Sequence, residues 1–115
     1  MIVYMIDDQG RARIAKLVNH EIARQGRTAK EVGSKGMPSV ATIKRIKAGE
    51  DVTPEMLDAL GGRLGLPRDF ILYVGTGDVR RIKASRAEDD LIRWVLDLIA
   101  EDRPNTGSRR RGKTG

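Results

Sequence analysis

The chain has 115 residues, no cysteine and a formal net charge of +6 at pH 7. This length suits one domain, or one small domain with an appendage, and without cysteine neither a disulfide nor a cysteine-based zinc site can form. The apolar residues 2–6 are too few for a signal peptide, and no run approaches the roughly 20 apolar residues of a membrane-spanning helix. We therefore expect a soluble, cytoplasmic protein.

Positive charge is concentrated in two parts of the chain. Residues 11–47 carry ten Lys or Arg against two Glu, a net charge of +8. Residues 103–115 carry five Lys or Arg and no acid, whereas residues 50–102 have a net charge of −5. Such asymmetry indicates a polyanionic partner for the basic segments, although chance clustering on a solvated surface gives the same pattern.

The first predicted helix follows Asp7 or Asp8, either of which can cap it, and ends near Gly26. Its apolar residues recur at helical spacing: Ile14, Leu17, Val18 and Ile22.

Residues 28–49 predict two short helices joined by a tight turn. Thr28 and Glu31 fit the capping-box pattern at the start of the first. Pro38 cannot continue that helix, because proline lacks an amide hydrogen. Ser39 can cap the second helix, and Gly49 can end it.

The rest of the chain also predicts helices. Thr53 and Pro54 mark a helix start. The apolar run 70–74 is short enough to be a helix or a strand, and as a strand it could pair with residues 79–83 in a hairpin. We favour a helix, with Asp78 capping one further turn, because every preceding element is helical. A last helix is predicted over residues 87–101.

The second helix of the 28–49 segment has two unlike faces at 100° per residue. Ile43 and Ile46 share one face and should pack inward. The opposite face combines small residues with cations, which suits the major groove of DNA, where cations reach guanines or phosphates and apolar side chains touch thymine methyl groups. The predicted base-reading residues are Val40, Ala41, Lys44 and Arg45. The predicted phosphate-contacting residues are Arg27, Thr28, Lys30, Lys35, Ser39 and Lys47.

Residues 28–49 resemble the helix-turn-helix segment of the Cro and lambda-repressor-like family. Val32 lies where the family has a core leucine, residues 42–43 and 45–46 match its second-helix signature, and Gly49 matches its closing glycine. Over about residues 14–74, the resemblance implies a bundle of four or five helices that reads bases with the four residues just named.

Four positions depart from the family pattern. Ala29 stands where a phosphate-contacting glutamine is frequent, and Gly33 replaces a usual alanine. Gly36 falls where an apolar core residue is common, and Lys47 where an acid is often found.

We predict an all-α fold with an N-terminal extension at 1–10, a helix-turn-helix domain at 11–77, a helical extension at 78–102 and a disordered basic tail at 103–115. The last helix is apolar around much of its circumference. It either pairs two copies of the chain in a homodimer or covers its own bundle. The residues predicted for a dimer interface are Leu91, Trp94, Val95 and Leu98. Residues 1–6 could add a strand to a neighbour, and the tail could follow phosphates or merely keep the protein soluble.

These features predict a sequence-specific double-stranded DNA-binding transcriptional regulator, a repressor of phage or bacterial type. We expect no catalytic activity, cofactor, metal site, small-molecule ligand or membrane contact, since the lone His20 lacks a second ligand at suitable spacing. The alternative is a protein-interaction module, such as an antitoxin or adaptor whose C-terminal helix binds a partner. A third possibility is an RNA-binding protein.

Overall fold

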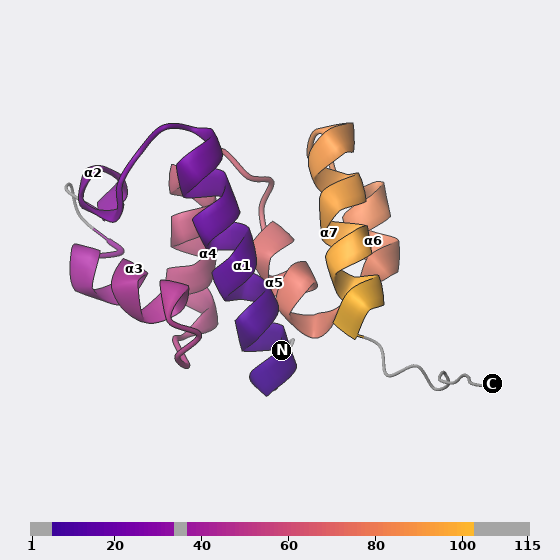
Figure 1. Cartoon of the computed structure of the whole chain (residues 1–115), viewed down its shortest axis with the longest axis horizontal. Helices are drawn as coiled ribbons and strands as arrows, with labels where there is room; N and C mark the ends of the chain where they lie inside the picture. The colour runs from indigo at the N-terminus through magenta and orange to yellow at the C-terminus, as the bar shows by residue number, and fades with distance from the viewer. Residues whose placement is uncertain (1–5, 34–36, 103–115) are drawn as a thin grey trace.

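A computed structural model describes residues 6–33 and 37–102 of the chain. Within these ranges it contains helices only, so the all-α prediction is confirmed and the hairpin alternative at 70–83 is excluded. The helices are α1 (Asp8–Arg24), α2 (Ala29–Gly33), α3 (Val40–Lys47), α4 (Pro54–Arg63), α5 (Phe70–Thr76), α6 (Val79–Ala84) and α7 (Asp89–Asp102) (Figure 1).

The predicted helix starts carry their capping hydrogen bonds. In the capping box, Thr28 N donates to Glu31 Oε1 at 2.8 Å and Glu31 N donates to Thr28 Oγ1 at 3.2 Å. Each bond satisfies an amide that would otherwise lack an intrahelical partner. Side-chain oxygens cap the other predicted starts at Asp7, Ser39, Thr53 and Asp78.

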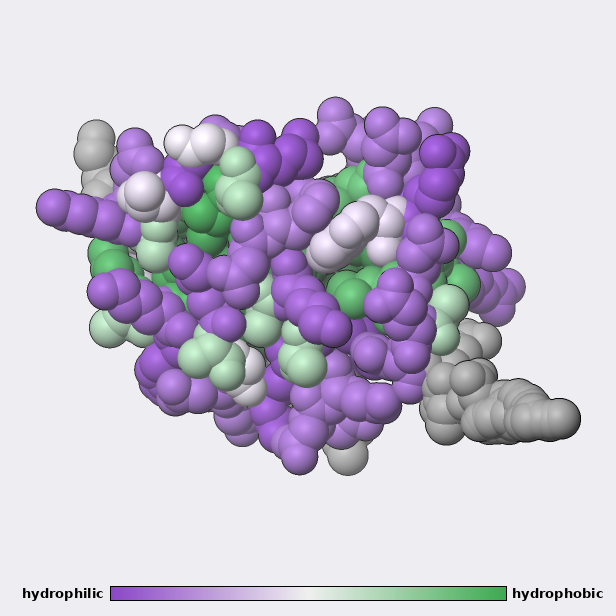
Figure 2. All heavy atoms as spheres, in the orientation of Figure 1, coloured by the Kyte–Doolittle hydropathy of each residue, from purple (hydrophilic) through white to green (hydrophobic). Residues whose placement is uncertain are grey.

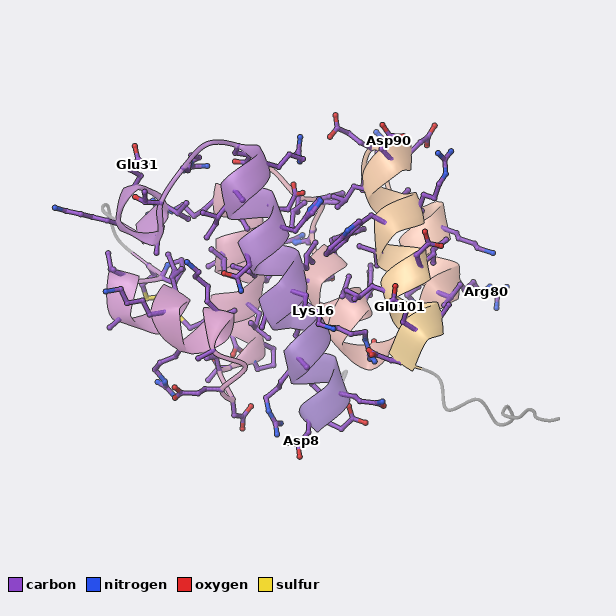
Figure 3. All side chains as sticks on the ribbon, viewed as in Figure 1. Asp8, Lys16, Glu31, Arg80, Asp90 and Glu101 are labelled. Carbon is purple, nitrogen blue, oxygen red and sulfur yellow. The ribbon has the colours of Figure 1, made fainter. Side chains whose placement is uncertain are left out.

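One continuous hydrophobic core joins all seven helices. α1 crosses the middle of the molecule and packs against α3, α5 and α7 (Figure 1). Polar residues cover most of the face seen in Figure 2, and charged side chains such as Asp8, Glu31 and Asp90 point away from the bundle (Figure 3). Burying each large aliphatic side chain contributes about 1.5–3 kcal/mol. In this bundle, α2 and α3 lie at one end of the molecule, and α6 and α7 lie side by side at the other.

α1 and α5 cross at a contact made by two glycines. A Cβ on Gly10 would overlap the carbonyl oxygen of Gly75, and a Cβ on Gly75 would lie 2.7 Å from Ile14 Cδ1. The buried Arg13 locks this crossing, because its Nε donates to Val74 O and its Nη2 to Gly75 O, both at 2.9 Å. The arginine thus supplies donors to two carbonyls near the end of α5, one of which, Val74 O, also accepts from Gly77 N at 3.2 Å.

α7 packs on its own bundle, and this corrects the predicted dimer interface. Val95 is fully buried, and Leu91 and Leu98 are also buried, so these three side chains cannot meet a second copy while α7 is docked. Trp94 is half-buried and stacks on His20 of α1, with 4.0 Å between the ring centroids. At the opposite end of α7, Asp102 Oδ2 lies 3.1 Å from Arg13 Nη1.

Several predictions concern residues at the ends of the chain. α1 begins at Asp8, so residues 8–10 of the predicted extension at 1–10 belong to that helix. The remaining N-terminal residues 1–5 and the predicted disordered tail lie outside the described residues, as do Lys35 and Gly36. In the part of the chain that the structure describes, no helix is both long and apolar enough to cross a membrane.

Candidate nucleic-acid interface

α2 and α3 approach each other closely because Gly33 has no side chain. A Cβ at this position would lie 2.9 Å from both Ile43 Cδ1 and Val40 N, closer than such atoms normally come. The backbone nitrogen of Val40 cannot move aside as the end of a flexible side chain could. The glycine at position 33 therefore has a steric cause: this pair of helices packs too tightly for a methyl group.

The two faces of α3 are distributed as the helical angles predict. Ile43 and Ile46 are almost completely buried, at 0% and 1% exposure, and join the core. On the opposite side, Ala41, Lys44, Arg45 and Ala48 are exposed, and Val40 is half-exposed. The helix is held by two isoleucines and presents its remaining side chains outward.

The four predicted base-reading residues do not share one environment. Lys44 is exposed, and its ammonium group has no partner among the described residues. Arg45 instead folds onto the loop after α3, where its Nε donates to Glu50 Oε1 at 3.2 Å and its Nη2 to Asp51 O at 3.1 Å. An exposed ion pair of this kind is worth roughly 0–1 kcal/mol, so a stronger acceptor can displace it.

The predicted phosphate-contacting residues divide in the same way. Lys30 is exposed and Lys47 is half-buried. Arg27 is half-buried and serves the fold, because its Nη1 donates to Gln25 Oε1 and to Arg63 O, both at 3.0 Å. The hydroxyls of Thr28 and Ser39 are already acceptors in their helix caps.

Met37 is a surface residue that the sequence reasoning missed. It is 62% exposed, and among the described residues no other large hydrophobic side chain is as exposed. It lies two residues before Ser39, the N-cap of α3. A large apolar residue in a turn between glycine and proline was a signal that could have drawn attention to it.

A buried polar cluster on α1 holds α7 rather than facing α3. The Glu21 carboxylate is fully buried, with Arg24 Nη2 at 2.8 Å from Oε1 and His20 Nδ1 at 3.1 Å from Oε2. Burial by itself raises the pKa of the Glu21 carboxyl, but the hydrogen bonds and charge of Arg24, with those of His20, outweigh burial and lower the pKa. Because His20 stacks on Trp94, the cluster positions α7.

A scan against protein-family models and searches of curated proteins and of solved structures gave no match to this chain. Within the described ranges, no three His, Cys, Asp or Glu side chains gather closely enough to hold a metal ion.

Proposed function

We propose that this protein is a sequence-specific double-stranded DNA-binding transcriptional regulator, in which α2 and α3 form a helix-turn-helix of the lambda-repressor-like kind. One observation carries the proposal. α3 is anchored through Ile43 and Ile46, while its outer face presents to solvent small side chains and Lys44, which has no partner within residues 6–33 and 37–102. This is the arrangement that a helix needs in order to enter a groove.

The dimensions and charge of α3 support this function. An α-helix with its side chains is about 10–12 Å across, and the major groove of B-DNA is about 12 Å wide. Ala41 and Ala48 add little to the diameter on the exposed side. α3 carries three cations and no acid, which favours approach to phosphates. Arg45 can exchange its weak surface pair with Glu50 for a phosphate near the end of α3.

In this proposal the protein binds an operator and represses transcription by excluding polymerase. A single reading helix makes few base contacts, so we propose a homodimer that spans two half-sites about 34 Å apart. With Leu91, Val95 and Leu98 buried in each protomer, the two copies must meet through other residues.

The rival function, binding of a partner protein by the C-terminal helix, has weaker support. It needs an apolar face on α7 that is open to a partner, yet the core of that face is buried against the chain's own helices.

The proposal is tested by selection of bound sequences from random duplexes, followed by affinity measurements at several salt concentrations. We expect an enriched sequence and an affinity that falls steeply with salt. Lys44→Ala should lower affinity and reduce the salt slope by about one. Lys83→Ala provides a matched control, because Lys83 is equally exposed but belongs to α6, away from α3 (Figure 1).

A selection that enriches no sequence would refute the proposal. A Lys44→Ala variant that binds as tightly as the unaltered chain and the Lys83→Ala control would refute it as well. Competition between the selected duplex and a structured RNA separates DNA binding from RNA binding. A clear preference for the RNA would replace this proposal with the RNA-binding alternative.

A further inference from the structure

We infer that the α3 end recognises its site chiefly through thymine methyl groups in the major groove, and that Met37 is a specificity-determining residue there. This inference rests on the proposed function and names the kind of DNA sequence that the same site would select. It adds a residue that the family resemblance does not assign.

The exposure of Met37 is the first step. Its side chain is 62% exposed, although methionine normally contributes to cores. A thioether offers no hydrogen-bond donor, so it cannot hold a phosphate or read a guanine. The apolar group that the major groove displays is the C5-methyl group of thymine. A flexible, polarizable side chain adapts well to such a partner.

The neighbours of Met37 are the second step. Val40 and Ala41 follow within four residues, at the start of α3, and both reach solvent. The N-terminal residues of a recognition helix are the ones that contact base edges. In Figure 2, hydrophobic atoms reach the surface among hydrophilic ones at the end of the molecule where α2 and α3 lie. The leading end of α3 therefore offers three apolar side chains to the bases.

The placement of the cations is the third step. Arg45 is the side chain best suited to a bidentate bond with guanine. It is bound to Glu50 and to Asp51 O in the loop after α3, away from the leading end of the helix. Among the described residues, the ammonium groups of Lys44, near the middle of α3, and of Lys47, at its last position, have no partner. Methyl contacts are thus the main source of discrimination, and Lys44 supplies attraction to the DNA.

Replacing thymine by uracil in the selected duplex isolates this effect. Uracil pairs with adenine as thymine does but lacks the C5-methyl group. Each thymine of the selected site is replaced in turn, and dissociation constants are measured by fluorescence anisotropy. At each contacted position we expect about fourfold weaker binding, which corresponds to the loss of one buried methyl-sized group.

Variants of Met37 assign the contact. At one of the positions where uracil weakens binding of the unaltered chain, the Met37→Ala and Met37→Gln variants should each bind the thymine and uracil duplexes equally well. Such a loss of discrimination is the signature of a pairwise coupling. Lys44→Ala is the control and should weaken binding to both duplexes by the same factor. Because Met37 is exposed, thermal unfolding should show both Met37 variants as stable as the unaltered chain.

The outcomes separate this inference from the proposed function. If the unaltered chain selects a site but binds it equally with thymine or uracil at every position, methyl readout is wrong while DNA binding stands. If uracil weakens binding but both Met37 variants keep the full sensitivity, Met37 is not a specificity residue. If no duplex is selected at all, both proposals fail together.

Discussion

The same substitution, glycine to alanine, should have opposite effects at two helical glycines. Gly33 ends α2, and a Cβ there would lie 2.9 Å from Val40 N and 3.1 Å from Ser39 C, both backbone atoms. Gly62 lies in α4 and is exposed, and apart from its chain neighbours and the backbone of its own helix no described atom would come within 4 Å of its Cβ. Intrinsic helix propensity favours alanine over glycine at both positions. Comparison of Gly33→Ala with Gly62→Ala therefore isolates the effect of tertiary packing.

The magnitudes follow from two competing terms. Alanine is more favourable than glycine in a helix interior by roughly 0.8–1 kcal/mol, and Gly62→Ala should therefore stabilise the protein by up to about 1 kcal/mol. At Gly33 this gain is smaller because the residue ends its helix, while overpacking costs about 1–3 kcal/mol. We expect Gly33→Ala to reduce the free energy of unfolding by about 1–2 kcal/mol.

Thermal unfolding followed by circular dichroism measures both effects. For a domain near 100 residues, 1 kcal/mol shifts the melting temperature by about 4–8 °C. Gly62→Ala should melt above the unaltered protein and Gly33→Ala below it. If Gly33→Ala melts at or above the unaltered protein while Gly62→Ala behaves as expected, then α2 and α3 do not pack as closely as described.

Two further predictions concern α1 and α7. Because the folded state lowers the pKa of Glu21, this carboxylate stabilises the protein above its unfolded pKa of about 4.3, and the contribution is lost as the pH falls through the lower folded pKa. In urea unfolding between pH 6 and pH 3, Glu21→Gln should lose less stability on acidification than the unaltered chain, and equal losses would contradict the pKa shift. Removal of residues 85–115 takes away Leu91, Val95 and Ile99, each worth about 1.5–3 kcal/mol when buried, so the truncated chain should melt far lower or not fold. A truncated chain that melts at the same temperature, whatever its mass in light scattering, would show that α7 is not part of the core.

Local signals in the sequence were sufficient for the helices and for the two faces of α3. The capping box of Thr28 and Glu31 acts over three residues, and the inward placement of Ile43 and Ile46 follows from 100° per residue. Such features depend on neighbours within one or two turns, so the order of residues fixes them. The candidate base-reading residues could be named for the same reason, because they share the face opposite the two isoleucines.

Only the tertiary structure decided that a predicted phosphate-contacting residue is engaged in the fold, and how the helices fit together. Arg27 is engaged by the backbone oxygen of Arg63, which is 36 positions away along the chain, and Arg13 meets Asp102 across 89 positions. The sequence carries no local pattern for such contacts, since they arise when distant segments pack. The same packing buried Leu91, Val95 and Leu98 of the predicted dimer residues, required a glycine at position 33 and left Met37 exposed. The sequence by itself determined that α3 has an outward, basic face. The packing of distant segments determined that another predicted contact residue, Arg27, serves the fold.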